Sequence, residues 1–440
     1  MTSSTTAEGG QPPATSPPLT GLFDTDRELV TARLRSAAEQ LAAMPSPRRR
    51  SPAHNTRAQR THDAARQVRT DFLDLHAERV YDTLTAGRTA HLRLAELART
   101  AGREFPGLAP SARQMADEAG RIQSEKEGWE IDQGILFRAL LRAPGPGAHL
   151  MESMLRPTPR ALELLPGFRE TGEVILKAAR LERRRSAGFV TITNDHCLNA
   201  EDNQHVVDLE TLVDLVLLDP QVRVGVLRGG FMTHPRYAGR RVFSAGINLK
   251  ELRAGNISFV DFLLGRELGY ISKLMRGLVR TDAPWPGTAV QKPWLGVVDG
   301  FAIGGGAQIL LACDRVLAAS DAYFSLPAAQ EGIVPGVANL RLTRFLGARQ
   351  ARRVVLWGRR IDAGEPGASL VFDEVAAPDA LDAAVAESVA VLAGPAVVAN
   401  RAMLNLADEP AGEFRAYLAE FALQQALRAY SPDVLATLHR

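Results

Sequence analysis

Hydrophobic residues recur at helical spacing through the first part of the chain. Apolar side chains fall at every third or fourth position of 24–44 (DTDRELVTARLRSAAEQLAAM) and of 84–101 (LTAGRTAHLRLAELARTA). Proline-rich segments at 44–52 and 142–149 break the pattern. The spacing predicts a further helix over 170–185 (ETGEVILKAARLERRR). We therefore expect an all-helical N-terminal domain over residues 21–185, after a disordered tail of Ser, Thr, Gly and Pro over 1–20.

The pattern changes near residue 186. Short apolar runs at 188–193, 222–230 and 294–300 read as strands, and a helix is expected between the first two, over 203–219. Further short strands follow, and helical spacing dominates from about 337 to the end. Strands separated by helices predict an α/β domain over 186–440, with helices at its C-terminal end.

Composition narrows the function classes. The 440 residues carry a formal net charge of +2, which is no sign of a nucleic-acid-binding surface. The two cysteines, Cys197 and Cys313, form no CxxC pair, and no Cys/His spacing suits zinc. The N-terminus has no signal-peptide pattern and no apolar run is long enough to span a membrane. We expect a soluble, cytoplasmic protein without a metal.

Candidate chemistry lies in two glycine-containing loops. Gly304, Gly305 and Gly306 stand between an expected strand and an expected helix, in DGFAIGGGAQILLACD (299–314). The run matches neither the dinucleotide fingerprint nor the P-loop. Bare backbone at the start of a helix exposes N–H groups that can bind an anion or a developing oxyanion. A second loop, VFSAGINLKEL (242–252), could supply another N–H to the same carbonyl oxygen.

These motifs resemble those of the crotonase (enoyl-CoA hydratase/isomerase) superfamily, together with TITNDHCLNA (191–200) and IDAGEPGASLVFDEVAAPDAL (361–381). The resemblance covers about 186–440. It implies a spiral of ββα units, homotrimers or dimers of trimers, and acyl-CoA thioester substrates. By motif position, the oxyanion donors would be the N–H groups of Ile247 and Gly305. Lys250 falls where the family often has a basic residue near the CoA phosphates, although a solvated lysine at a helix start is the alternative.

Two positions depart from the hydratases of the family. Gln308 and Ala328 stand where those enzymes have glutamates. Neither residue can shuttle a proton, so hydration of a double bond is not expected. Together with the helical N-terminal extension, these changes resemble a branch of cofactor-independent dioxygenases, which act on an arylacetyl-CoA in glycopeptide antibiotic biosynthesis. The resemblance implies O2 as co-substrate, no cofactor and an arylglyoxylate product. A hydrolase, isomerase or decarboxylase of the same family stays open, as does a non-catalytic acyl-CoA-binding scaffold.

Five further residues, together with Gln308, complete the expected site. We expect Glu201, Arg266 and Gln308 to bind ring hydroxyls, although Glu201 could instead act as a base or favour a helix N-terminus, and Arg266 could be a surface arginine. An apolar O2 pocket is expected beside the α-carbon. Its candidates, for which core packing is the alternative, are Leu249, Ile333 and Val434. The N-terminal domain is expected to cover this pocket and exclude water.

Overall fold

The structure is a computed structural model that describes residues 18–280 and 289–438. Most of the expected disordered tail, residues 1–17, lies outside the described residues. At the end of that tail, the backbone N–H and the hydroxyl of Thr20 both donate to Asp26 Oδ1, at 2.7 and 2.8 Å. Asp26 lies at the start of α1, so the described chain is held in place from its first helix.

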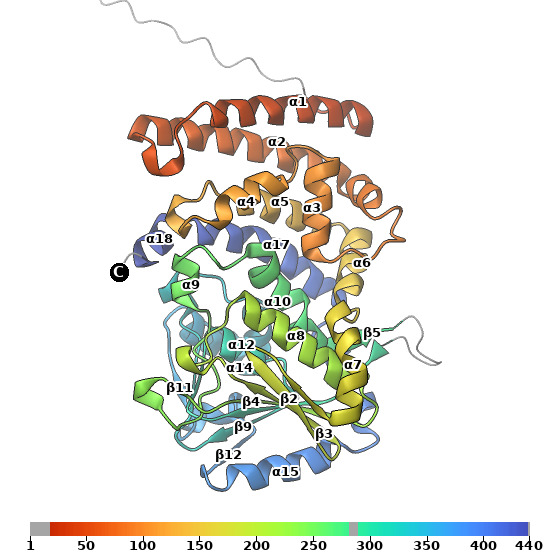
Figure 1. Cartoon of the computed structure of the whole chain (residues 1–440), viewed down its shortest axis with the longest axis vertical. Helices are drawn as coiled ribbons and strands as arrows, with labels where there is room; N and C mark the ends of the chain where they lie inside the picture. Colours follow the sequence, from red (N-terminus) through yellow and green to blue (C-terminus); the bar gives the residue numbers. More distant parts are fainter. Residues whose placement is uncertain (1–17, 281–288, 439–440) are drawn as a thin grey trace, which may run out of the picture.

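The N-terminal part is helical, as the spacing predicted. Its helices are α1 (Phe23–Ala42), α2 (Pro52–Leu84), α3 (Leu94–Glu104), α4 (Ala112–Ala119), α5 (Trp129–Arg142), α6 (Pro144–Met154) and α7 (Pro159–Thr171). Helices α1 and α2 lie side by side at one end of the molecule (Figure 1). The break expected at 44–52 separates them. The break at 142–149 is shorter than expected, because Pro144 and Pro146 fit the first turn of α6, where no N–H is needed.

The prediction of a helix over 170–185 is wrong. Helix α7 ends at Thr171, and Gly172 follows with a positive φ of 73°. Strands β1 (Glu173–Ile175) and β2 (Ala179–Arg184) then pair antiparallel. In β2 the buried Ala179 and Leu181 flank an exposed Arg180, which is the two-residue period of a strand and not the helical one. The sheet therefore begins within the span that we had assigned to the helical domain.

A mixed seven-stranded sheet forms the centre of the second half. Its strand order is β1-β2-β3-β4-β7-β9-β12, antiparallel at the β1–β3 end and parallel from β3 onward. Strands not yet given are β3 (Ala187–Ile192), β4 (Val224–Gly229), β7 (Trp294–Val298), β9 (Arg315–Ala319) and β12 (Glu374–Ala376). The strands predicted at 188–193, 222–230 and 294–300 are confirmed. Parallel strands joined by helices give the α/β domain that the sequence predicted.

A small second sheet lies next to the glycine run. Strand β10 (Tyr323–Ser325) pairs parallel with β8 (Phe301–Ile303) and antiparallel with β11 (Ile361–Asp362). Strand β8 leads directly into α12 (Gly305–Leu310). A separate hairpin-like pair joins β5 (Leu278–Val279) and β6 (Ala289–Val290). The second sheet thus fixes the strand from which the glycine loop starts.

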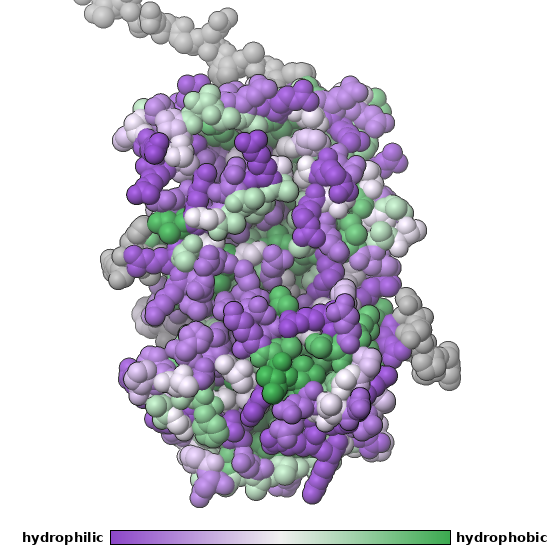
Figure 2. Space-filling view, viewed as in Figure 1, coloured by the Kyte–Doolittle hydropathy of each residue, from purple (hydrophilic) through white to green (hydrophobic). Residues whose placement is uncertain are grey.

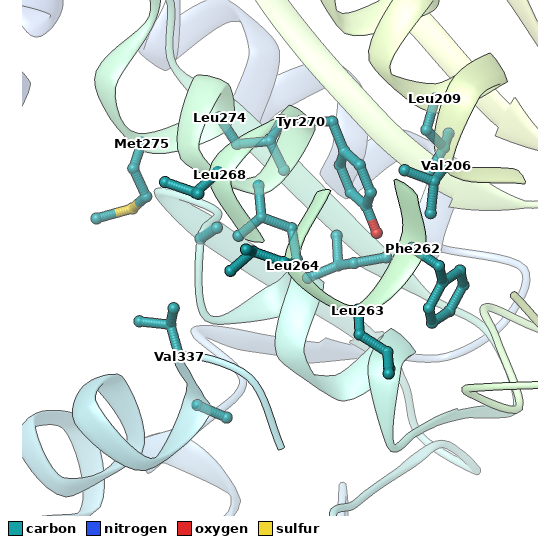
Figure 3. Packing of buried hydrophobic residues seen from close by; sticks show 14 of the residues in the cluster. Val206, Leu209, Phe262, Leu263, Leu264, Leu268, Tyr270, Leu274, Met275 and Val337 are labelled. Carbon is teal, nitrogen blue, oxygen red and sulfur yellow. The ribbon is translucent and has the colours of Figure 1, made fainter. Parts of the chain in front are cut away.

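Helical segments fill the middle region of the chain, and α8 among them packs on strands β2, β3 and β4 of the main sheet. The segments are α8 (Asn203–Leu218), α9 (Leu249–Arg253), a π-helix (Phe259–Leu264), α10 (Gly265–Leu268) and α11 (Tyr270–Arg276). Figure 3 shows Phe262, Leu264 and Leu268 from these segments packed together, with the Tyr270 hydroxyl pointing inward among them. The helix predicted over 203–219 is confirmed as α8. Apolar packing therefore holds the segment that carries Arg266.

Six helices follow in the described C-terminal part, of which α17 returns to the N-terminal helices and α15 packs on the main sheet. The six are α13 (Ala328–Glu331), α14 (Ala338–Val355), α15 (Leu381–Leu392), α16 (Val397–Asp408), α17 (Ala411–Ala429) and α18 (Pro432–Leu438). Helix α17 runs between the sheet and the N-terminal helices (Figure 1) and packs along α5. Within the described ranges no single helix is long and apolar enough to cross a bilayer; α15 and α16 meet that test only jointly, across a 90° bend.

A buried glutamate joins the N-terminal helices to the site-bearing segments. Glu130 of α5 accepts a hydrogen bond from Phe259 N–H at 2.9 Å and another from the Tyr430 hydroxyl at 2.6 Å. Phe259 opens the π-helix, and Tyr430 follows α17. One side chain of the helical region therefore fixes the positions of both segments.

We expect Glu130→Ala to lower the free energy of unfolding by about 2–4 kcal/mol, because it leaves a buried N–H and a buried hydroxyl without an acceptor. Chemical denaturation monitored by circular dichroism measures this change. Glu130→Gln keeps one acceptor oxygen and should cost less. Equal stability of the alanine variant and the unchanged protein would contradict this role.

Candidate active site

The two glycine loops lie against each other. Ile303 N–H donates to Ser244 O at 2.9 Å, which ties the end of β8 to the loop over 242–248. Gly246 has a φ of +83°, and a Cβ there would lie 2.8 Å from Ile303 O. Gly304 has a φ of +52° and a Cβ there would lie 3.6 Å from Gly246 Cα. Glycine is thus favoured at both positions by backbone conformation, and at 246 also by the close approach of the loops.

The other two glycines of the run are required by their neighbours. A Cβ on Gly305 would lie 2.2 Å from Glu201 Oε1, and a Cβ on Gly306 would lie 2.6 Å from Ser244 Cβ. Both distances are far shorter than any van der Waals contact. The run therefore allows the first turn of α12 to pack directly against Glu201 on one side and the Ser244 loop on the other.

Ile247 and Gly305 both line one cavity. Gly305 is the first residue of α12, where an N–H has no partner inside the helix. Glu201 N–H donates to Gly246 O at 2.7 Å and Asn248 N–H donates to Glu201 O at 2.8 Å, on either side of Ile247. In the described part of the chain, neither the Ile247 nor the Gly305 N–H donates to a backbone carbonyl of a turn or loop. The role of these two amides as donors to one oxygen atom stays a prediction.

The cavity has a volume of about 40 Å³. Its walls come from both loops, the π-helix, α10, α12, α17 and the segment after α13. The lining residues are Glu201, Ile247, Phe262, Leu263, Arg266, Glu267, Gly304, Gly305, Gln308, Glu331, Ile333, Val334, Gly336, Phe421 and Gln425. This volume holds a water or another very small molecule, whereas drug-sized ligands need roughly 300–1,000 Å³. An aromatic acyl group enters only when lining side chains move.

Arg266 is the centre of the polar contacts in the cavity. Its Nη1 donates to Gln308 Oε1 at 2.7 Å and to Glu267 Oε1 at 2.8 Å. Its Nη2 lies 2.8 Å from Glu201 Oε2 and donates to Gly305 O at 3.1 Å. Sequence reasoning left open a surface position for Arg266, but its side chain is buried. The structure thus brings Glu201, Arg266 and Gln308 together.

Arg266 is well supplied with partners, whereas one oxygen of Glu201 has none among the described residues. Burial lowers the pKa of the Arg266 guanidinium, but the Glu201 and Glu267 carboxylates raise it by more, so the pKa ends above its usual value. The Tyr270 hydroxyl donates to Glu201 Oε2 at 3.3 Å, and burial holds the pKa of Tyr270 well above its usual value. Glu201 Oε1 is buried and has no hydrogen-bond partner in the described chain. A buried acceptor of this kind is available to a hydroxyl of a bound molecule.

The expected O2-pocket residues lie at different depths. Ile333 lines the cavity. Val434 is buried beside Gly332, where a Cβ on the glycine would lie 2.6 Å from Val434 Cγ2, so Val434 stands behind the wall. Leu249 is 50% exposed and is not in the cavity lining. The structure therefore brings one of these three side chains to the cavity.

Lys250 is exposed at the start of α9, directly after the loop that carries Ile247. An exposed position suits a contact with CoA phosphates and equally suits a solvated lysine. Its role stays a prediction. No group of three or more His, Cys, Asp or Glu side chains able to hold a metal ion occurs among the residues that the structure describes.

Sequence reasoning missed several residues of the site. Glu267 and Tyr270 flank Arg266 on the same short helices, at spacings of one and four residues. Phe421 and Gln425 come from α17, far along the chain. Glu331 lies one helical turn after Ala328, on α13. The sequence did offer one signal for Glu331, because a residue three positions after Ala328 on a helix lies on the same face as Ala328.

Comparison with known proteins identifies the family. The sequence model of the enoyl-CoA hydratase/isomerase family matches residues 182–415. This chain is an enoyl-CoA hydratase/isomerase (crotonase) family protein. The resemblance drawn from the loop motifs is confirmed. The match ends before most of α17 and does not include the helices up to α7, so the family accounts for the sheet domain and not for the helical part.

The relatives differ in how much of this chain they match. The (3,5-dihydroxyphenyl)acetyl-CoA 1,2-dioxygenase of Amycolatopsis orientalis is 58% identical over 93% of this chain and 94% of its own length. A probable enoyl-CoA hydratase of Rhizobium meliloti (strain 1021) is 29% identical over 51% of this chain and 80% of its own. The crystal structure of an enoyl-CoA hydratase from Mycobacterium avium subsp. paratuberculosis K-10 covers 61% of this chain and 100% of that chain, with 24% identity and a TM-score of 0.49. The first relative shares the helical region as well as the crotonase domain.

We expect Gly305→Ala to destabilise this crotonase-family protein by about 1–3 kcal/mol, because the new methyl group collides with Glu201 beside the buried ion pair. Urea denaturation measures the change. Gly167→Ala, in a part of α7 where a Cβ meets nothing within 4 Å, is the matched control and should be neutral or stabilising by up to about 1 kcal/mol. If both variants were equally stable, the close packing of Gly305 on Glu201 would be refuted.

Proposed function

We propose that this protein is a dioxygenase that converts (3,5-dihydroxyphenyl)acetyl-CoA and O2 to 3,5-dihydroxyphenylglyoxylate and CoA, without a metal or an organic cofactor. The observation that carries the proposal is the 58% identity, over nearly the whole of both chains, to the A. orientalis enzyme of that name. The site supports it in two ways. The paired loops that could stabilise an enolate are present, and Gln308 and Ala328 replace the proton-shuttling glutamates of hydratases.

The first step is binding of the thioester carbonyl. Its oxygen would accept hydrogen bonds from Ile247 N–H and Gly305 N–H. Negative charge grows on this oxygen when the α-proton leaves, so these donors stabilise the enolate more than the bound substrate. Their close packing, enforced by Gly246 and Gly304, keeps the donors in position without reorganisation during the reaction.

The aryl ring would be held through its hydroxyls. Glu201 Oε1 is a buried acceptor with no partner in the described residues, and it faces Gly305. Gln308 has an amide that can both donate and accept, and its oxygen is already fixed by Arg266. A ring hydroxyl that donates to Glu201 would give Oε1 the hydrogen bond that it lacks. A ring without hydroxyls would leave this acceptor unpaired, which disfavours its binding.

Oxygen chemistry then needs no redox group in the protein. The carbanion transfers an electron to O2, and the resulting radicals combine to form a peroxide at the α-carbon. The peroxide attacks the thioester carbonyl and expels the CoA thiolate. Breaking the O–O bond of the cyclic peroxide, with loss of the second α-hydrogen as a proton, gives the α-keto acid. Both atoms of O2 enter the product, the α-carbon is oxidised, and CoA takes up a proton.

Apolar residues would separate this chemistry from water. Ile333, Val334 and Phe262 contribute apolar walls to the cavity. The π-helix and α17, which are joined to the N-terminal helices through Glu130, also contribute residues to the cavity lining. A dry site protects the carbanion from protonation and the peroxide from hydrolysis.

We also propose that the enzyme works as a homo-oligomer in the cytoplasm, where CoA thioesters are metabolised. Exposed apolar side chains on α15 and α16 support an interface: Val391, Met403, Leu404 and Leu406. Figure 2 shows a further apolar patch beside α7 and α8 on an otherwise largely hydrophilic face. Apolar patches of this kind commonly mark protein interfaces.

We expect the chelator-treated protein to consume one O2 for each CoA released from (3,5-dihydroxyphenyl)acetyl-CoA. An oxygen electrode together with a thiol assay measures the two quantities. Phenylacetyl-CoA, which lacks the hydroxyls, should react at least ~100-fold more slowly in kcat/KM. Release of CoA without oxygen uptake would identify a hydrolase instead, and loss of activity on chelation that metal restores would contradict the absence of a metal.

A further inference from the structure

Three glutamates line the cavity, and Arg266 holds two of them. Glu201 Oε2 and Glu267 Oε1 each lie 2.8 Å from a different Nη atom of Arg266. Glu267 Oε2 also accepts Val337 N–H at 3.2 Å. The oxygens bound in this way are already engaged by a cation or an N–H group.

The third carboxylate, Glu331, is different. It is partly buried at the end of α13 and lines the cavity, yet no ion pair or side-chain hydrogen bond of Glu331 occurs among the described residues. The guanidinium of Arg428 lies beside Gly332, the residue after Glu331, and it is bound to Gly332 O and to Asp433. Burial, without a compensating cation, raises the pKa of the Glu331 carboxyl above its usual value.

The segment after Glu331 is packed on the centre of the site. A Cβ on Gly336 would lie 2.1 Å from Glu267 Oε1 and 2.6 Å from Gln308 Oε1. Val334 N–H donates to Gln425 Oε1 at 2.8 Å, which fixes the segment to α17. The Tyr417 hydroxyl donates to Gly336 O at 2.6 Å, a second bond to α17. Glu331 therefore precedes a segment whose backbone is fixed, and it lines the same cavity as the groups that would hold the substrate.

We propose that Glu331 is the general base that removes the α-proton of the bound arylacetyl thioester. This assignment rests on the proposed function. The C–H bond breaks, its electron pair passes to the enolate oxygen held by Ile247 and Gly305, and the proton moves to a carboxylate oxygen of Glu331. In the complete reaction that proton leaves with the departing CoA thiolate.

The two candidate bases differ in what surrounds them. Glu201 Oε2 is paired with Arg266, and its Oε1 is packed against Gly305, next to one of the oxyanion donors. Glu331 comes from a different wall, has no cation to stabilise its anion, and is flanked by the apolar Ile333 and Val334. An unpaired, partly buried carboxylate is the stronger base, and its basicity is better matched to a carbon acid.

The test measures removal of the α-proton in the absence of O2. (3,5-Dihydroxyphenyl)acetyl-CoA is incubated anaerobically in D2O with the full-length protein, and deuterium at the α-carbon is measured by mass spectrometry. We expect Glu331→Gln to lower the exchange rate by at least ~100-fold, Glu331→Asp to retain part of it, and Glu201→Gln to exchange faster than Glu331→Gln at saturating substrate. The surface variant Glu170→Gln, on α7, is the matched control and should exchange at the rate of the unchanged protein.

Other outcomes overturn the assignment. Exchange at the unchanged rate in Glu331→Gln, with thermal unfolding also unchanged, would exclude Glu331 as the base. Loss of exchange in Glu201→Gln but not in Glu331→Gln would assign the role to Glu201. Exchange without oxygen uptake in air would refute the dioxygenase and leave the assignment of the base standing. Neither exchange nor turnover by the unchanged protein would refute both.

Discussion

The buried guanidinium of Arg266 is the interaction on which the site depends. It contacts Glu201 after β3, Glu267 beside it, Gln308 in α12 and the carbonyl of Gly305. Three segments, namely the loop after β3, α10 and α12, are therefore held together by one side chain, and the fork of the guanidinium matches this arrangement where a lysine could not. Removing one partner from a buried ion pair costs about 3–5 kcal/mol, because the remaining charges lose their compensation. The glycine run belongs to the same arrangement, since only glycine at 305 leaves room for Glu201.

The position of Arg266 depends in turn on the N-terminal helices, which lie outside the crotonase domain. Glu130 binds the first residue of the π-helix and the residue after α17. The π-helix leads directly into α10, which carries Arg266, and α17 contributes Phe421 and Gln425 to the cavity. π-helical turns are uncommon and often occur at functional sites. The helical region is thus a structural part of the site, which agrees with its presence in the relative that is similar over nearly the whole chain.

The sequence was most informative where a short segment determines its own geometry. The glycine run and the loop around Ile247 are local, so their place at one cavity could be foreseen. Arg266 could be proposed but not placed, because its partners Glu201 and Gln308 lie far from it along the chain and only the fold brings them together. Strands β1 and β2 were misread as a helix because their charged residues suit both structures, and the deciding feature was the alternation of buried side chains. Glu331 was passed over because its lack of a cation is visible only in three dimensions.

The central claim is that a substrate carbanion, stabilised by backbone amides, reacts directly with O2. The most direct measurement is isotopic labelling of the product. The protein is incubated with (3,5-dihydroxyphenyl)acetyl-CoA under 18O2 in ordinary water, and the α-keto acid is analysed by mass spectrometry. The account predicts two 18O atoms in each product molecule, one in the keto group and one in the carboxylate. A product with an oxygen derived from water in the carboxylate, beyond slow exchange of the keto oxygen, would contradict the attack of the peroxide on the thioester.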